Sequence, residues 1–302
     1  MNRQHVCRKE GNIPLKLHNK KKWNTLNIVV FVILLVYALT LLYPFLYLLL
    51  GSLNDSWGFM QDPLGVPEKV TFENFKSVFF NMAEVTGMES LSLQSMFFNS
   101  ITLALGLTVV SVMLQSMVAY VLAKYDFRGN RLLYMTIIVS SMIPTVGALT
   151  ATFKLMNQTH LTGTYLGMIL LQASAFGGQF LHMHAYYKSI PWTYGESAMI
   201  DGASDLQIYF RIMMPLAKKA LSTYFVLTFL GFWNDYWLPS LFYEQRPTLA
   251  VGLNHISVIA TGTGNYPLLF AAMLVTIIPV LILFAVFQKQ MLGNVTGGGI
   301  KG

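Results

Sequence analysis

The chain has 302 residues, of which 54% are hydrophobic and only 11% are charged, whereas an average soluble domain carries roughly 25% charged residues. This composition excludes an ordinary soluble domain and favours a protein that has lipid as part of its solvent. The single cysteine, Cys7, excludes a disulfide framework and a cysteine metal cluster within the chain. The formal charge of +7 is compatible with nucleic-acid binding, so the positions of the charges decide its meaning.

The N-terminal segment 1–27 is basic, and an apolar run follows over 28–50. At about 1.5 Å per residue, this run gives about 34 Å of helix. The apolar core of a cleaved signal peptide has only about 7–15 residues. We therefore interpret 28–50 as a retained transmembrane span.

Further apolar runs along the chain are each long enough to cross about 30 Å of hydrocarbon. The six predicted spans cover residues 28–50, 97–123, 132–152, 164–187, 220–242 and 266–287. Pro144 and Pro279 fall inside spans, where neighbouring helices make a kink tolerable. Gly177 and Gly178 permit close helix packing. The sequence therefore predicts an all-α, six-helix transmembrane domain over 28–287.

Sixteen of the 20 Lys and Arg residues lie in segments that are cytoplasmic if the N-terminus is cytoplasmic. These segments are 1–27, 124–131, 188–219 and 288–302. Because an excess of basic residues marks cytoplasmic loops, both termini are predicted to lie inside the cell. The charge then requires no nucleic acid, and the N-terminal basic residues are expected to contact anionic membrane lipid.

The inside loop 188–219 is the most informative segment of the chain. Pro191 ends the preceding helix, and small residues follow up to Gly202, which interrupts the run or adopts a left-handed turn. An amphipathic stretch comes next, and Pro215 is expected to close it before the fifth span. The pattern suits a short helix pressed into a pocket of another protein, and a helix lying on the lipid surface is the alternative.

Residues 196–203, E-S-A-M-I-D-G-A, resemble the E-A-A-x-x-x-G loop of bacterial binding-protein-dependent ABC permeases. The residues that match the fuller family pattern are Glu196, Ala198, Asp201, Gly202, Ala203, Ile212 and Pro215. Ser197 stands where the family usually has alanine. The resemblance is to the carbohydrate-uptake, maltose-type members, and within these to the smaller of the two permeases.

Other segments carry the same resemblance from roughly Phe98 to Gly302. They are N-S at 99–100, Y-V-L-A-K-Y-D-F-R-G at 120–129, F-W-N-D-Y-W at 232–237, P-T-L-A-V-G-L at 247–253 and V-T-G-G-G-I-K-G at 295–302. A single short match would be weak. The agreement of several matches in the right order makes the resemblance specific.

The resemblance implies the type I ABC importer permease fold in a bacterial cytoplasmic membrane, and a transport subunit without a catalytic site of its own. It implies three kinds of partner: a second homologous permease, two ATP-binding subunits and an external solute-binding protein. ATP and Mg²⁺ would belong to the ATP-binding subunits, and this chain would hold no cofactor. The inside loop would then be a coupling helix seated on an ATP-binding subunit. Its expected docking residues are Glu196, Ser197, Ala198, Asp201, Gly202, Ala203, Ile212 and Pro215.

Two more contacts are implied by the resemblance. The C-terminal segment 288–302 would reach between the ATP-binding subunits through its glycine-rich end, with a frayed end as the alternative. The residues concerned are Gly298, Gly299, Ile300, Lys301 and Gly302. The outside loop between the fifth and sixth spans would meet the solute-binding protein. Its expected contact residues are Leu249, Gly252, His255, Gly262 and Gly264.

Asp235 is the one charged residue within the fifth predicted span and lies about 22 Å from the inner start of that span. A carboxylate inside the membrane costs about 2.5–3.5 kcal/mol on insertion scales and usually faces a cavity or a partner. One hypothesis places it on the sugar path together with Trp233, Asn234 and Trp237. The alternative, which we favour, is an Asn–Asp pair that hydrogen-bonds between helices.

The predicted function is a permease subunit of an ATP-driven importer for a sugar or oligosaccharide. A permease for a phosphate ester or an oligopeptide is the alternative within the same class. A secondary transporter would show repeat symmetry and coupling charges, and an intramembrane enzyme would need further catalytic groups beside Asp235. His182 and His184 are two positions apart and so lie on different helix faces, which does not favour a metal site.

Overall fold

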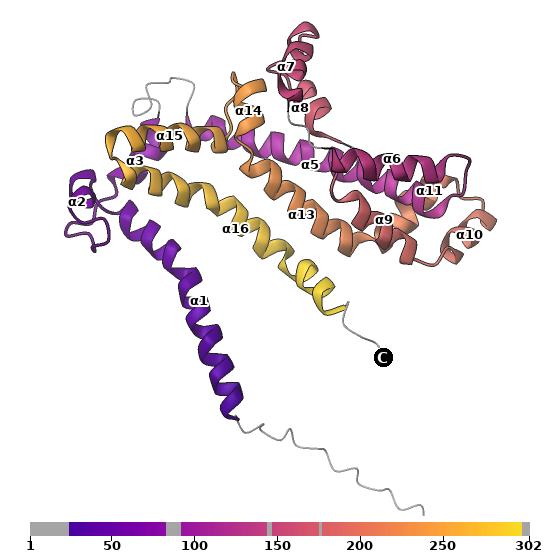
Figure 1. Cartoon of the computed structure of the whole chain (residues 1–302), viewed down its shortest axis with the longest axis horizontal. Coiled ribbons are helices and arrows are strands. Elements are labelled where there is room, and N and C mark those ends of the chain that lie inside the picture. The colour runs from indigo at the N-terminus through magenta and orange to yellow at the C-terminus, as the bar shows by residue number, and fades with distance from the viewer. Residues whose placement is uncertain (1–23, 83–91, 144–146, 175–176, 298–302) are drawn as a thin grey trace, which may run out of the picture. The chain divides into compact units, whose positions relative to one another are not determined.

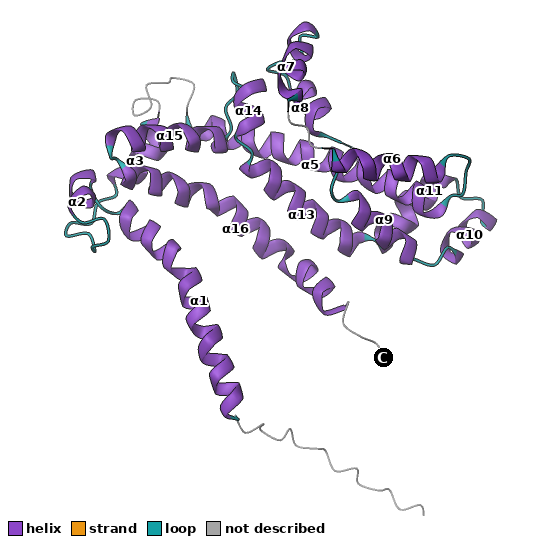
Figure 2. Cartoon of the chain, in the orientation of Figure 1, coloured by secondary structure: helices purple, strands orange, loops and turns teal. Residues whose placement is uncertain are grey.

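The computed structural model describes residues 24–82, 92–143, 147–174 and 177–297, with side chains up to residue 288. All regular elements in these ranges are helices (Figure 1, Figure 2). In chain order they are α1 (Thr25–Ser52), α2 (Ser56–Gln61), α3 (Glu73–Phe80), α5 (Leu93–Lys124), α6 (Asn130–Met142), α7 (Ala148–Gln158), α8 (Tyr165–Gln172), α9 (Phe180–Ser189), α10 (Thr193–Ile200), α11 (Asp205–Ile208), the π-helix η1 (Tyr209–Met213), α12 (Met214–Leu216), α13 (Lys218–Asn234), α14 (Trp237–Phe242), α15 (Leu249–Thr263) and α16 (Tyr266–Gly297).

The chain divides into two compact units, residues 1–46 and residues 47–302. Most of α1 belongs to the first unit, and its 28 residues contain no charged side chain. Within the described residues, three helices are long and apolar enough to cross a membrane: α1, α5 and the part of α16 from Tyr266 to Gln288. These three correspond to the first, second and sixth predicted spans.

α5 organises the second unit. Its N-terminus is capped by Ser92, whose hydroxyl accepts a hydrogen bond from the amide of Ser95 at 3.3 Å. α9 and α13 pack along it most extensively, and α3, α8 and α15 also contact it. Five polar side chains of α5 are buried by this packing: Ser100, Thr108, Ser111, Gln115 and Ser116. A polar stripe therefore runs along the inside of the bundle.

The other three predicted spans are interrupted helices, and this corrects the continuous spans expected from the sequence. Residues 132–152 fall on α6 and α7, 164–187 on α8 and α9, and 220–242 on α13 and α14. α7 begins after Gly147, which has a φ of 87°, and Pro144 lies outside the described residues. Hydropathy does not reveal such breaks, because the residues on both sides remain apolar. At membrane depth, irregular backbone is tolerated where it is buried in protein or lines a cavity.

Of the two glycines expected to pack closely, Gly177 does so and Gly178 does not. A Cβ atom on Gly177 would lie 2.5 Å from Nε2 of Gln115, whereas a Cβ on Gly178 would meet nothing within 4 Å. Gly177 therefore brings the start of α9 against the middle of α5.

Three clusters of buried apolar residues hold the second unit together. One joins α3, α13, α15 and α16 to the N-terminal half of α5 around Met96. Another joins the C-terminal half of α5 to α6, α9 and the inside loop around Tyr120 and Tyr209. The third joins α7, α8 and α14 to α5 through Phe242. The inside loop and α15 therefore pack at opposite ends of the same helix (Figure 1).

Candidate functional site

The inside loop 188–219 begins with the short helix α10, which ends in a Schellman motif. The amide of Ala203 donates to the carbonyl oxygen of Ala198 at 2.9 Å, and the amide of Gly202 donates to that of Met199 at 3.0 Å. Gly202 has a φ of 82°, in the left-handed region where a Cβ atom is strained. The left-handed turn predicted at Gly202 is thus confirmed.

Local hydrogen bonds fold the stretch that follows Gly202. Ser204 and Gln207 form a capping box on α11, in which the side chain of each accepts from the backbone amide of the other, at 3.4 Å and 2.9 Å. A π-helical turn, Tyr209–Met213, comes next, and such turns are frequent at functional sites. Pro215 closes this stretch as expected, because the helical run from Asp205 through α11, η1 and α12 ends at Leu216 and α13 begins at Lys218.

A buried chain of hydroxyl groups anchors the π-helix to α5 and α9. The hydroxyl of Tyr209 donates to Oγ of Ser116 at 2.9 Å, and the same oxygen lies 2.7 Å from the hydroxyl oxygen of Tyr187. The rings of Tyr120 and Tyr209 pack with their centroids 5.1 Å apart. Burial raises the pKa of Tyr209, so its hydroxyl keeps its proton and remains a donor. Ser116 therefore ties the loop to two long helices at once.

A second group of contacts holds the first part of the loop to the C-terminal end of α5. The hydroxyl of Tyr125 donates to Oδ1 of Asp205 at 2.9 Å, and its ring packs on Trp192 with centroids 5.4 Å apart. The ammonium of Lys124 donates to the carbonyl oxygen of Ile190. Burial raises the pKa of Tyr125. None of these anchoring residues was assigned a role from the sequence.

The opposite face of the loop is exposed and combines acidic with large apolar side chains. Glu196 and Asp201 are exposed, and neither takes part in the one salt bridge of the described residues, which joins Glu73 to Lys76. The exposed apolar members of this face are Tyr194, Met199, Ile200, Leu206 and Phe210. We call these five residues together with Glu196 and Asp201 the loop surface. Contiguous exposed apolar groups rimmed by polar ones are typical of a protein interaction site.

The expected docking residues divide between the exposed face and its support. Five of them are exposed: Glu196, Ser197, Asp201, Gly202 and Pro215. Ala198 is buried, and Ala203 and Ile212 are half-buried against the core formed by α5 and α9. Ala198 therefore packs in the core beneath the loop, while Ala203 and Ile212 contact the core and are also partly exposed.

A polar cavity of about 370 Å³ lies where two interrupted spans meet the middle of α5. The break between α8 and α9 contributes Gln172 and Gln179, and the break between α13 and α14 contributes Asp235. Ser111 and Gln115 of α5 line it as well. The cavity thus explains why irregular backbone is tolerated in these two spans.

The carboxylate of Asp235 forms hydrogen bonds that link the break between α13 and α14 to the end of α8. Its Oδ1 accepts from the amides of Trp237 at 3.0 Å and Leu238 at 3.3 Å, which caps the N-terminus of α14. Its Oδ2 accepts from Nε2 of Gln172 at 3.3 Å. The inter-helix hydrogen bond expected of the Asn–Asp pair is therefore present at Asp235, with Gln172 of α8 as its partner, and absent at Asn234.

The other three residues of the expected solute path do not line this cavity. Trp233 is only 2% exposed and stacks on Phe229 with ring centroids 5.5 Å apart. The side chain of Asn234 donates to the carbonyl oxygen of Leu230 in its own helix at 2.9 Å. Trp237 is exposed beyond the break. Of the four, Asp235 alone combines a polar side chain with a place in the cavity.

The outside loop expected to meet a binding protein is largely helical, since it forms α15. Leu249 and Gly252 are buried, and a Cβ atom on Gly252 would lie 2.3 Å from the sulfur of Met96. Gly264 ends the helix with a φ of 76°. The exposed positions on α15 include Asn254, Val258, Thr261 and Gly262, while His255 is half-buried.

The tail residues Gly298, Gly299, Ile300, Lys301 and Gly302 lie outside the described residues, so their expected contact with ATP-binding subunits stays a prediction.

The side chains that sequence reasoning missed are the hydroxyl anchor of the loop and the polar stripe of α5. The stripe has a signal in the sequence, because Thr108, Ser111 and Gln115 recur at helical spacing in an otherwise apolar run.

Residues 115–291, which include the loop and most of the cavity lining, match the family described as the binding-protein-dependent transport system inner membrane component. The chain belongs to this family. The arabinooligosaccharides transport system permease protein AraQ of Bacillus subtilis is 30% identical, over 95% of this chain and 100% of its own length. The diacetylchitobiose uptake system permease protein NgcG of Streptomyces coelicolor is 27% identical, over 89% of this chain and 87% of its own.

A solved structure supports the fold. The chain is similar to one in the crystal structure of a bacterial ABC transporter involved in the import of the acidic polysaccharide alginate. The TM-score is 0.70 and the identity 26%, over 87% of this chain and 95% of that one. The expected membrane-permease fold and family are confirmed.

Proposed function

We propose that this chain is a transmembrane subunit of an ATP-driven importer that carries a sugar or oligosaccharide across a bacterial cytoplasmic membrane. In this proposal the six crossings are α1, α5, α6 with α7, α8 with α9, α13 with α14, and α16, and both termini are inside the cell. The chain itself catalyses no reaction. A second permease completes the path, two ATP-binding subunits hold ATP and Mg²⁺, and an external binding protein delivers the solute.

The observation that carries the proposal is that adjacent residues of one helix serve the two candidate sites. On α5, Ser116 bonds to the loop through Tyr209, and Gln115 lines the polar cavity. α9 is shared in the same way, because it carries Tyr187 and begins at the cavity with Gln179 as its N-cap. A force applied to the loop surface therefore reaches the cavity wall through two helices.

This arrangement suits alternating access driven from the cytoplasm. Closure of the ATP-binding subunits would press on the loop surface, and the anchored loop would carry the ends of α5 and α9 with it. The breaks near Gly178 and Asp235 allow the inner half of each interrupted span to move relative to its outer half. Solute sites at discontinuous helices are a recurrent device of membrane transporters.

A sugar fits the cavity better than the alternative solutes. Hydroxyl and amide side chains line it, and hydroxyl-rich solutes form hydrogen bonds with such groups. Within the described residues no Lys or Arg lines it, whereas a phosphate ester is normally held by basic groups. The relatives named for arabinooligosaccharides and diacetylchitobiose support the same substrate class. A permease for an oligopeptide remains the second candidate.

Reconstitution tests this proposal. The chain is co-purified with its second permease and ATP-binding subunits, placed in proteoliposomes loaded with ATP and Mg²⁺, and supplied outside with the binding protein. We expect uptake of a labelled oligosaccharide that requires internal ATP. Uptake of a phosphate ester or oligopeptide, but of no oligosaccharide in the panel, would contradict the sugar assignment. Uptake that persists without ATP would contradict the ATP-driven mechanism.

A further inference from the structure

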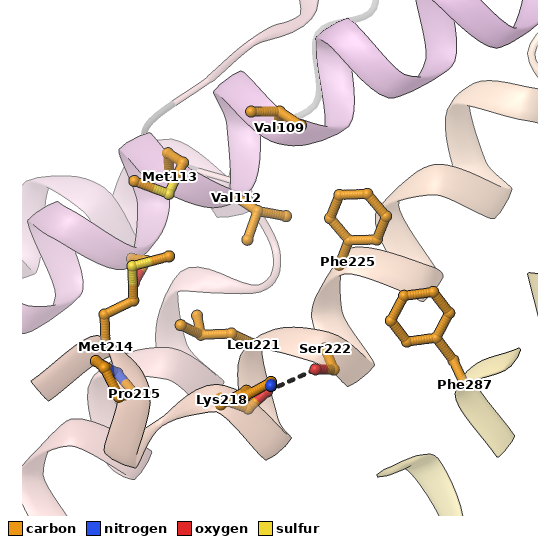
Figure 3. Close-up of a pocket in the computed structure, with 11 residues that line it drawn as sticks. Val109, Val112, Met113, Met214, Pro215, Lys218, Leu221, Ser222, Phe225 and Phe287 are labelled. Carbon is orange, nitrogen blue, oxygen red and sulfur yellow. Dashed lines mark hydrogen bonds between the residues drawn. The ribbon is translucent and has the colours of Figure 1, made fainter. Parts of the chain in front are cut away.

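An apolar groove lies between α5, α13 and α16 and adjoins the inside loop at one end (Figure 3). It holds about 600 Å³, which is within the range of pockets that bind small molecules. Most of its lining is hydrocarbon from the three helices, including Val109, Val112, Met113, Leu221, Phe225 and Phe287. The rings of Phe225 and Phe287 stack with centroids 6.1 Å apart and join α13 to α16.

One end of the groove carries a positive charge. Lys218, the first residue of α13, is exposed and lines this end next to Pro215 of the inside loop. Phe225 lies seven positions further along α13, or about 10 Å from Lys218 along the helix axis. The groove is therefore amphipathic along its length, with a cation at the end nearest the inside loop and hydrocarbon beyond it.

The other polar groups of the lining are already bonded within the protein. The hydroxyl of Ser222 donates to the carbonyl oxygen of Lys218 at 2.7 Å. Oγ of Ser116 belongs to the hydroxyl chain with Tyr187 and Tyr209. No acidic side chain of the described residues lines the groove. An occupant therefore meets one uncompensated cation and otherwise apolar surface.

We propose that this groove is a binding site for an anionic phospholipid, with one acyl chain along the groove and the phosphate at Lys218. The charge pattern favours lipid over a helix of a second protein, because a packed helix would take the lysine out of water without an acidic partner in the lining. Basic pockets between transmembrane helices on the cytoplasmic side are known to bind anionic head groups. The bound acyl chain would fill the space between the three helices and stabilise the packing of α16 against α5 and α13.

The test compares two neighbouring lysines in the intact transporter. Lys219 is also exposed but does not line the groove, so Lys219→Gln is the matched control for Lys218→Gln. The purified complex is exposed to phosphatidylglycerol or phosphatidylcholine, and retained lipid is counted by native mass spectrometry. We expect Lys218→Gln to reduce phosphatidylglycerol retention about fivefold, as for the loss of one lysine near an anionic surface, and Lys219→Gln to leave it unchanged.

A second variant tests the hydrocarbon part of the site. Val109 lines the groove from α5 and is 49% exposed, so Val109→Trp fills it with little strain on the core. We expect this variant to reduce retention of both lipids while the complex stays assembled on size exclusion. Equal retention in the two lysine variants would overturn the proposal, whether or not Val109→Trp assembles. Loss of the second permease from Val109→Trp together with unchanged lipid retention in Lys218→Gln would identify a protein interface instead.

Discussion

The hydroxyl groups that anchor the loop and the polar cavity lie on adjoining turns of α5, yet they differ in the hydrogen bonding of their buried polar groups. At the anchor, the hydroxyl groups of Ser116, Tyr187 and Tyr209 bond to one another. At the cavity, Oγ of Ser111 and Oε1 of Gln115 are buried without a hydrogen-bond partner among the described residues. A buried polar group left unpaired costs about 1–3 kcal/mol. The polar groups of the anchor are therefore paired with one another, whereas two polar groups beside the cavity are not.

This difference distinguishes a fixed contact between helices from a site that binds a solute. The anchor is suited to transmit motion, since its bonds hold the loop, α5 and α9 together in one arrangement. The cavity is suited to exchange partners, because it is lined by hydroxyl and amide side chains with which water or the hydroxyl groups of a solute can form hydrogen bonds. Variants can therefore change the loop or the cavity separately.

The largest effect is expected from Gly202→Asp. Aspartate is among the residues that tolerate a φ of 82°, so its main effect is the negative charge that it adds beside Asp201 on the exposed face. We expect the subunit to remain in the membrane and in the complex, while uptake and transport-coupled ATP hydrolysis are abolished. Normal uptake and normal hydrolysis in this variant would refute a docking role for the loop.

The matched control for that variant is Gly202→Asn. Asparagine tolerates the left-handed conformation better than most residues and carries no charge. We expect it to retain most of the uptake. If it is as inactive as Gly202→Asp, then space at this position matters more than charge.

A smaller effect is expected from Tyr209→Phe, which removes one hydroxyl and keeps the ring. Ser116 then loses one of its two partners, and we expect the complex to be destabilised by about 1–2 kcal/mol. Solute carried per ATP hydrolysed should fall several-fold, because the loop is less firmly joined to α5. Tyr37→Phe is the control, since Tyr37 is 61% exposed on α1 and belongs to neither the loop surface nor the cavity lining. An unchanged transport ratio in Tyr209→Phe would show that the hydroxyl chain is only structural.

The smallest effect is expected from Asp235→Asn. The amide oxygen can still accept from the two amides that Asp235 caps, so α14 should form normally. The charge facing the cavity is lost, and we expect the relative uptake of competing sugars to shift a few-fold. Asn234→Ala provides the comparison, because Asn234 bonds within its own helix and does not line the cavity. Unchanged preference in Asp235→Asn would confine this residue to its role between helices.

The sequence predicted correctly the features that depend only on local residues. Gly202 could be assigned a left-handed turn because only the backbone of that residue decides it, and the span at 97–123 follows from length and hydropathy alone. The hydroxyl chain could not be found in this way. Ser116 is separated from Tyr187 by 71 positions and from Tyr209 by 93, so its partners emerge only once α5 and α9 have packed.

The helix breaks and the outside loop were missed for a different reason. The residues flanking Asp235 and Gly177 are apolar enough to be taken for uninterrupted spans, although capping by a carboxylate and close packing by a glycine interrupt them. The segment between the fifth and sixth predicted spans was expected to be a loop, yet most of it forms α15. Gly252 instead serves close packing against Met96 within a regular helix.

In the proposed mechanism the loop, once pressed by ATP-binding subunits, changes the access of the polar cavity. The chain has a single cysteine, so Cys7→Ser gives a background without thiols in this subunit. Thr228→Cys then places a thiol in the cavity lining, and Leu227→Cys places one on the neighbouring exposed position outside it. Both are labelled with a membrane-impermeant thiol reagent from the outer side of the reconstituted complex.

We expect trapped ATP to change the labelling rate several-fold in Thr228→Cys but not in Leu227→Cys, and added Gly202→Asp to remove the change. A nucleotide-dependent change that persists with Gly202→Asp, or a cavity thiol whose labelling never responds to ATP, would contradict this mechanism.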